Sequence, residues 1–256
     1  MKLKSLITPY LGFIYLFFYI PIIVLIVYSF NNAQYSLLWH GFTWQWYSEL
    51  FIDTDLWIAA YHSLALGIAA ATLATMIGTL ASVSIYRYRF LGRPILNALV
   101  FILILSPEIV IGVSLITLFT ICNVPLGFIS LLLSHTSFCI PFVIVTLYSR
   151  LVSFDKNIFE AAKDLGANDR LILTRIILPL LWQALLASWL LSFTLSLDDV
   201  IISYFVAGPE FEILPLKIYS MVRSGIKPEI NALCTVLFAI TFILVGLSQL
   251  ALRKKA

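Results

Sequence analysis

Long apolar runs alternate with short polar segments along the whole chain. A bilayer core of about 30 Å needs roughly 20 apolar residues in helical conformation. Six runs are long enough, and they cover residues 9–29, 61–85, 95–121, 126–149, 179–206 and 232–252. Their apolar residues are continuous and do not alternate with period two, which favours helices over the strands of a membrane barrel. The pattern therefore predicts an all-α polytopic membrane protein with six transmembrane helices.

The composition supports this class and excludes several others. The chain has 256 residues, of which 61% are apolar and 11% charged, and its mean hydropathy is +1.02. A soluble domain has about 45–50% apolar and about 25% charged residues. We therefore exclude a cytosolic enzyme, a secreted disulfide scaffold and a disordered chain. The cysteines Cys122, Cys139 and Cys234 lie far apart, so no metal site is predicted, and no nucleic-acid partner is expected.

The cations are unevenly distributed among the segments that join the runs. Thirteen of the 16 Lys and Arg residues lie in alternate segments that include both ends of the chain. By the positive-inside rule, both termini are predicted to be cytoplasmic. The opposite segment, 31–60, has no Lys or Arg but four tryptophans, which suit an interfacial belt or a surface for an extracytoplasmic partner. We expect residues 1–56 to form an anchor helix and outer loop, and residues 57–252 the transmembrane core.

Three acids fall inside the predicted spans without a cation beside them. They are Glu108, Asp198 and Asp199. A charge at the centre of a span costs about 2.5–3.5 kcal/mol, so these acids need a partner or a wet path. On straight helices, Glu108 lies roughly 20 Å and Asp198 roughly 28 Å from the inner surface. We predict a path for a positively charged substrate in the outer half; the alternative is that the acids are protonated or bond to hydroxyls of neighbouring spans.

Serines accompany the acids of the fifth run at helical spacing. The stripe consists of Ser188, Ser192, Ser196, Asp199 and Ser203. Such stripes either pack helices together or line a pathway, and the acids favour a pathway here. His135 in the fourth run is predicted to make a structural hydrogen bond.

The inner segment 150–179 differs from the rest of the chain because charged and apolar residues alternate along it. Apolar residues recur at helical spacing, as in Ile158, Ala162 and Leu165. Asp155 can cap one short helix and Gly166 can end it, after which Asn168 or Asp169 can open a second. The pattern predicts a helix–Gly–helix element that enters a groove on a partner protein, or alternatively an amphipathic hairpin lying on the membrane.

This segment resembles the signature of the permease subunits of ABC importers. The matching residues are Glu160, Ala161, Ala162, Gly166, Ile176, Leu178 and Pro179. The resemblance implies a type I ABC importer permease fold in which this loop docks into a cleft of a cytoplasmic ATPase. Glu160 would make polar contacts in that cleft, the two alanines would allow close approach, and Gly166 would form the turn. The chain has no G-x-x-x-x-G-K-[ST] loop, so it is not predicted to be an enzyme; ATP and Mg²⁺ would bind to the partner ATPase.

Beyond this loop, nearly the whole chain resembles the C-type permease subunits of spermidine/putrescine ABC importers. The resemblance is most specific in SLDDVIISYFVAGP at 196–209 and ILPLKIYSMVRSGIKPEINAL at 213–233. It implies a linear polyamine as substrate and an assembly in the inner-membrane lipid with a B-type permease, an ATPase dimer and an extracytoplasmic polyamine-binding protein. Many such permeases have an aspartate after the proline of the third span, where this chain has Glu108.

Two alternatives remain at this point. An ABC permease for another cationic ligand, such as a metal ion, would favour His, Cys or Met along the path, and only His135 and scattered cysteines are present. An ion-coupled secondary transporter also uses buried acids, but its fold often has inverted repeats and broken helices, and neither is evident from the sequence.

Overall fold

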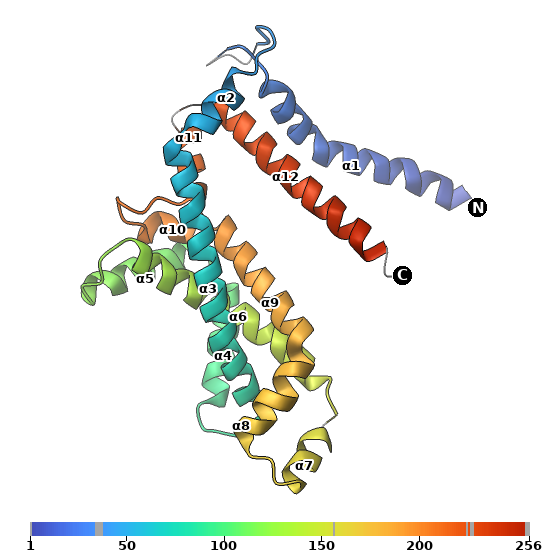
Figure 1. The fold of residues 1–256 in the computed structure, drawn as a ribbon, viewed down its shortest axis with the longest axis vertical. Coiled ribbons are helices and arrows are strands. Elements are labelled where there is room, and N and C mark those ends of the chain that lie inside the picture. The colour runs from blue at the N-terminus through green and yellow to red at the C-terminus, as the bar shows by residue number, and fades with distance from the viewer. Residues whose placement is uncertain (1, 34–37, 156, 224, 226–227, 254–256) are drawn as a thin grey trace. The chain divides into compact units, whose positions relative to one another are not determined.

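The computed structural model describes residues 2–33, 38–155, 157–223, 225 and 228–253. No β-strand occurs among these residues, and the expected all-α class is confirmed. The helices, drawn in Figure 1, are α1 (Lys2–Tyr28), α2 (Gln45–Ile52), α3 (Thr54–Arg87), α4 (Arg93–Leu105), α5 (Glu108–Ile121), α6 (Phe128–Val152), α7 (Asn157–Asp164), α8 (Asp169–Ile172), the π-helical segment η1 (Leu173–Ile177), α9 (Leu178–Asp198), α10 (Ile201–Val206), α11 (Leu214–Arg223) and α12 (Pro228–Arg253).

The structure confirms a multi-pass membrane protein but not an exact count of six spans. Four helical stretches are long and apolar enough to cross a bilayer, namely Tyr10–Tyr28, Thr54–Arg87, Phe128–Val152 and Asp169–Asp198. Helices α4 and α5 make a fifth span if the bent pair is counted as one. Residues Pro228–Ile243 of α12 form a shorter apolar helix. Six spans are reached only when both of these are included.

Two of the predicted spans are interrupted where the sequence pattern suggested continuous helices. The run 95–121 bends by 115° between α4 and α5, with Ser106 and Pro107 both in extended conformation. Proline has no N–H to donate to the preceding turn, which helps to end α4 there. The run 179–206 is interrupted after Asp198, because Asp199 is extended and α10 begins at Ile201.

The chain divides into two compact units. One consists of Met1–Ile58 together with Lys217–Ala256, and the other of Ala59–Leu216. In the first unit, α12 packs against both α1 and α2. The buried Trp46 donates its indole N–H to the carbonyl of Asn31 at 2.8 Å, so this tryptophan holds α2 against the segment that follows α1. The predicted division at residue 56 stays a prediction.

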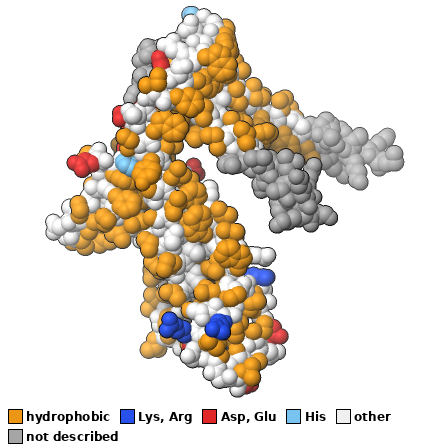
Figure 2. All heavy atoms as spheres, in the orientation of Figure 1, with side chains coloured by type: hydrophobic (Ala, Val, Ile, Leu, Met, Phe, Trp, Pro, Cys, Tyr) orange, Lys and Arg blue, Asp and Glu red, His pale blue; other side chains and the backbone are white. Residues whose placement is uncertain are grey.

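Helix α6 is the centre of the second unit. It packs against α4, α5, α9 and α10, and small residues allow the close approach of its neighbours. A Cβ on Gly78 of α3 would lie 2.6 Å from Cγ1 of Val143. Figure 2 shows apolar side chains along the helices of this unit and Lys and Arg side chains at the end that carries α7 and α8. The second unit thus has the charge pattern of a membrane core with one basic end.

Candidate functional site

The two helix breaks bring the three predicted path acids into one region. Glu108 is the first residue of α5, whereas Asp198 and Asp199 lie at the break between α9 and α10. Helix α5 packs against α10 through Gly112, where an added Cβ would lie 2.7 Å from Cδ2 of Phe205. Glu108 interacts electrostatically with both aspartates. The straight helix assumed for residues 95–121 is bent just before Glu108, and the three acids are grouped in the fold; the depth of Glu108 and its place on a substrate path stay predictions.

The three acids differ in their surroundings. Glu108 and Asp198 are exposed, so their carboxylates are accessible to a ligand. Asp199 is only 7% exposed. Its carboxylate accepts hydrogen bonds from the backbone N–H groups of Ile202 at 3.2 Å and Ser203 at 2.8 Å, and from the Ser203 hydroxyl at 2.7 Å. Asp199 thus caps α10 and is satisfied within the chain.

His135 of α6 completes this buried network. Its Nδ1 lies 2.7 Å from Oγ of Ser196 and its Nε2 lies 2.9 Å from Oγ of Ser203. The same Nε2 is 3.5 Å from a carboxylate oxygen of Asp199, and the histidine is 1% exposed. The predicted structural hydrogen bond of His135 is confirmed. The whole stripe is buried, comprising Ser188, Ser192, Ser196, Asp199 and Ser203, and this favours packing of α9 against α6 over a pathway.

The inner segment 150–179 forms the predicted helix–Gly–helix element. The Asp155 carboxylate accepts a hydrogen bond from the N–H of Asn157, the first residue of α7. Gly166 has φ +82° just after α7, a conformation that glycine adopts without the steric cost of a Cβ. The Asn168 side chain accepts from the N–H of Leu171 and caps α8. Both predicted caps and the glycine stop are therefore confirmed.

The exposed surface of α7 differs from the predicted small-residue face. Ala162 is 8% exposed and packs with Phe159 against Ile172 and Ile177. Glu160 and Ala161 are exposed, and Leu165 at the helix end is 89% exposed. The two alanines thus lie on different faces, because Ala162 is used by the chain's own core. The surface open to a partner includes Glu160, Ala161 and Leu165.

The remaining signature residues join this element to α9. Ile176 packs against the same core as Ala162, Leu178 is the first residue of α9 and Pro179 follows it in the first turn. Proline is well placed there because the first N–H groups of a helix have no partner within it.

An ion pair that the sequence did not reveal fixes the start of α8. Arg87, at the end of α3, lies 2.8 Å from the carboxylate of Asp169. The Tyr88 hydroxyl donates to the other oxygen of that carboxylate at 2.8 Å, and this hydrogen bond raises the pKa of Tyr88 above its ordinary value. The only signal in the sequence was the cluster of aromatic and basic residues at 84–90. The contact ties the second helix of the inner segment to a predicted span.

Comparison with known proteins identifies the transport class. Residues 74–255 match the family model for the binding-protein-dependent transport system inner membrane component. The chain belongs to this family. It is therefore a membrane-embedded permease subunit of a transport system and not an enzyme.

Relatives of this permease include two from Escherichia coli strain K12. The chain is 53% identical to the spermidine/putrescine transport system permease protein PotC over 242 residues, which are 94% of this chain and 92% of PotC. It is 39% identical to the putrescine transport system permease protein PotI, over 89% of this chain and 83% of PotI. A PotC of Haemophilus influenzae is 51% identical over 94% of each chain.

Solved structures give the same fold for this permease. A chain of a bacterial ABC transporter involved in the import of alginate superposes with a TM-score of 0.75, at 16% identity, over 97% of this chain and 95% of that one. The expected ABC importer permease fold is confirmed. This chain does contain broken helices, so the expectation that they were absent gave no argument against a secondary transporter. Its membership of the permease family excludes that alternative.

Proposed function

We propose that this permease conducts polyamines inward across the inner membrane as one subunit of an ATP-driven importer. The observation that carries the proposal is the 53% identity to PotC, whose name gives spermidine and putrescine as its substrates. The other relatives at 39% identity or more are also named for polyamines. No observation favours a metal ion as the alternative cargo.

The chemistry of the helix breaks suits an ammonium group. Glu108 and Asp198 present exposed carboxylates, and neither α5 nor α10 contains a Lys or Arg. Tyr204 of α10, which is 55% exposed, offers an aromatic face, and a cation over such a face gains about 0.5–2 kcal/mol. We assign the path contacts to Glu108 and Asp198. Asp199 contributes by holding α10, since its oxygens already accept hydrogen bonds from Ile202 and Ser203.

The energy for transport is assigned to a partner. In this proposal the inner segment 150–179 docks into a cleft of the ATPase dimer. The exposed residues Glu160, Ala161 and Leu165, in α7 and at its end, are among those that enter the cleft. ATP and Mg²⁺ bind to the ATPase and not to this chain. A B-type permease completes the membrane part, an extracytoplasmic polyamine-binding protein delivers the substrate, and both termini are cytoplasmic.

The test is uptake of radiolabelled spermidine and putrescine by the complete assembly reconstituted in liposomes. Glu108→Gln and Asp198→Asn should each lower uptake by about tenfold or more, because a hydrogen bond to a charged group contributes about 1.5–3 kcal/mol. Glu210→Gln is the matched control, since Glu210 is an exposed acid in the loop that follows α10, and its uptake should stay at the parental rate.

Two results would count against the proposal in different ways. If the parental assembly takes up neither polyamine, the substrate is wrong. If it does so and both neutral variants transport at the parental rate, the substrate stands and the acidic path is wrong. ATP hydrolysis stimulated by the loaded binding protein should persist in both variants, because neither residue lies in the segment assigned to the ATPase.

A further inference from the structure

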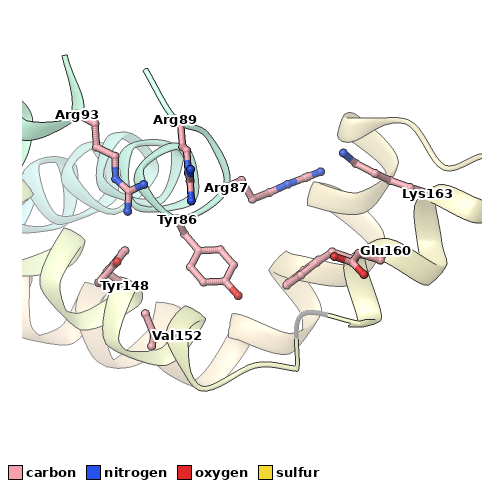
Figure 3. Close-up of a pocket in the computed structure, with 9 residues that line it drawn as sticks. Tyr86, Arg87, Arg89, Arg93, Tyr148, Val152, Glu160 and Lys163 are labelled. Carbon is pink, nitrogen blue, oxygen red and sulfur yellow. The ribbon is translucent and has the colours of Figure 1, made fainter. Parts of the chain in front are cut away.

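A pocket of about 660 Å³ lies at the basic end of the second unit, between the end of α3 and the helix–Gly–helix element of residues 150–179, which we call the coupling element. Its basic side chains are Arg87 at the end of α3, Arg89 in the segment that joins α3 to α4, Arg93 at the start of α4, and Lys163 on α7. Glu160 is the acid among its lining residues. We call this cavity the basic pocket; Figure 3 shows Arg89 and Arg93 directed into the same space as the ring of Tyr86.

The charge of the basic pocket is not neutralised by its own walls. Arg87 is paired with Asp169 and its side chain is 9% exposed. Within the described part of the chain, no ion pair joins Arg89, Arg93 or Lys163 to a carboxylate. Guanidinium groups bind phosphate oxygens through paired N–H donors. The pocket therefore fits a phosphate-bearing anion.

A second observation in the wall of the pocket is a buried hydroxyl without a partner. The Oη atom of Tyr86 is buried and makes no hydrogen bond among the described residues. An unmet buried hydroxyl costs free energy, and a small shift of the Tyr86 ring that brought this hydroxyl to a polar occupant of the pocket would offset that cost. Tyr148, from α6, adds another hydroxyl-bearing ring to the same lining.

The pocket borders an outward apolar face. Helix α4 begins at Arg93, and its exposed residues Ile95, Leu99 and Ile102 are 66%, 52% and 57% exposed. They recur at spacings of four and three and so share one face of the helix. Leu91, between the two free arginines, is fully exposed. Apolar chains lying along this face would place an attached phosphate beside Arg93.

We propose that the basic pocket binds the phosphate of an anionic membrane lipid, whose acyl chains lie along the exposed face of α4. Basic pockets between helices on the cytoplasmic side of a membrane suit such headgroups. The inference rests on the proposed orientation, in which this end of the unit faces the cytoplasm. A lipid held here would touch both the end of α3 and α7, and so would stabilise the position of the coupling element.

The test places the complete assembly in nanodiscs of phosphatidylcholine, with or without phosphatidylglycerol. The assembly is then released from the nanodiscs, and native mass spectrometry measures which lipid stays bound to it. The parental assembly should retain phosphatidylglycerol in preference to phosphatidylcholine. Arg89→Gln with Arg93→Gln should weaken this retention roughly 30-fold, since each cation near an anionic membrane surface gives about a fivefold gain in binding. Arg89→Lys with Arg93→Lys should keep most of it.

The matched control is Arg150→Gln with Arg170→Gln. These two exposed arginines belong to the same basic end but do not line the pocket, and the control should retain lipid as the parent does. Equal retention in the Arg89/Arg93 Gln variant and the parent would overturn the proposal. Displacement of the lipid by millimolar inorganic phosphate would also overturn it, because the ligand would then be a soluble anion. Loss of the lipid whenever the ATPase is bound would overturn it as well. Polyamine uptake is measured separately, so failure here leaves the proposed substrate untouched.

Discussion

His135 is the residue that holds the break between α9 and α10 in place. Its two ring nitrogens contact hydroxyls on either side of that break, Ser196 in α9 and Ser203 in α10. Ser203 in turn donates to Asp199. A histidine can serve both sides because each ring nitrogen has its own hydrogen-bonding direction. The network therefore supports the position of the neighbouring Asp198 without including it.

Replacing His135 with Leu should lower the stability of the protein. The change leaves the buried Ser196 hydroxyl without its partner, at a cost of about 1–3 kcal/mol. Ser203 loses one contact but still donates to Asp199. We expect the apparent unfolding temperature to fall by several degrees when tryptophan fluorescence is followed on heating in detergent. Ser137→Ala on the same helix is the control, because Ser137 is exposed and its hydroxyl bonds only to its own helix at Leu133. A parental unfolding temperature in the Leu variant would contradict the structural role.

The sequence predicted which acids lie together but not how their surroundings differ. Glu108, Asp198 and Asp199 stood out because charges are costly in apolar runs. Their separate environments depend on contacts between distant segments, such as α5 with α10 at Gly112. The spacing of residues along one helix contains no information on such contacts. Asp199 therefore looked equivalent to Asp198, although it is bonded within the chain.

Some features of the coupling element could be predicted from the local sequence, and others could not. Its caps and glycine stop are local features, and the sequence predicted Asp155, Gly166 and Asn168 correctly. The face that the helix buries depends on what packs beside it. Ala162 is covered by the chain's own core, whereas Leu165 is 89% exposed, and periodicity alone placed both on one apolar face.

Gly166→Val should uncouple transport from ATP hydrolysis while leaving the protein in the membrane. A Cβ at Gly166 meets no atom within 4 Å, so the penalty comes from φ +82° and not from a clash. A left-handed residue with a Cβ costs about 1–2 kcal/mol, and β-branching adds to this. Uptake and substrate-stimulated ATPase activity of the assembly are the measurements, with membrane content checked by immunoblot.

Gly166→Asn is the variant that separates this explanation from a general need for small size. Asparagine tolerates the left-handed conformation better than other residues with a side chain, and the space around Gly166 is open. It should therefore retain most of the parental uptake. Loss of uptake in the Asn variant equal to that in the Val variant would show that the backbone conformation is not the reason.

Broken helices are the part of the fold that apolar patterning could not predict. Pro107 lies at the bend between α4 and α5, but Pro141 lies inside α6, which continues from Phe128 to Val152 without a break. The same residue type thus has opposite outcomes in two apolar runs. What separates them is packing with other helices, because neighbouring segments decide whether the freed backbone groups are satisfied.

For the whole molecule, the apolar content predicted the class correctly. Apolar runs long enough to cross a bilayer predicted a multi-pass protein, and the structure and the family agree. The net charge of +3 conceals an uneven distribution, in which most cations lie in alternate segments. That distribution predicts the orientation of the chain, and it can be tested independently of transport.

The orientation should be visible in the labelling of single cysteines in right-side-out membrane vesicles. In a background with Cys122, Cys139 and Cys234 replaced, Glu210→Cys should react with a membrane-impermeant maleimide at once, because residue 210 is exposed and lies in a predicted outer loop. Asp164→Cys, exposed at the end of α7, should react only after permeabilisation. The cysteine-free background gives the baseline. Early labelling at position 164 with protection at 210 would invert the topology, and with it the assignment of residues 150–179 to a cytoplasmic ATPase.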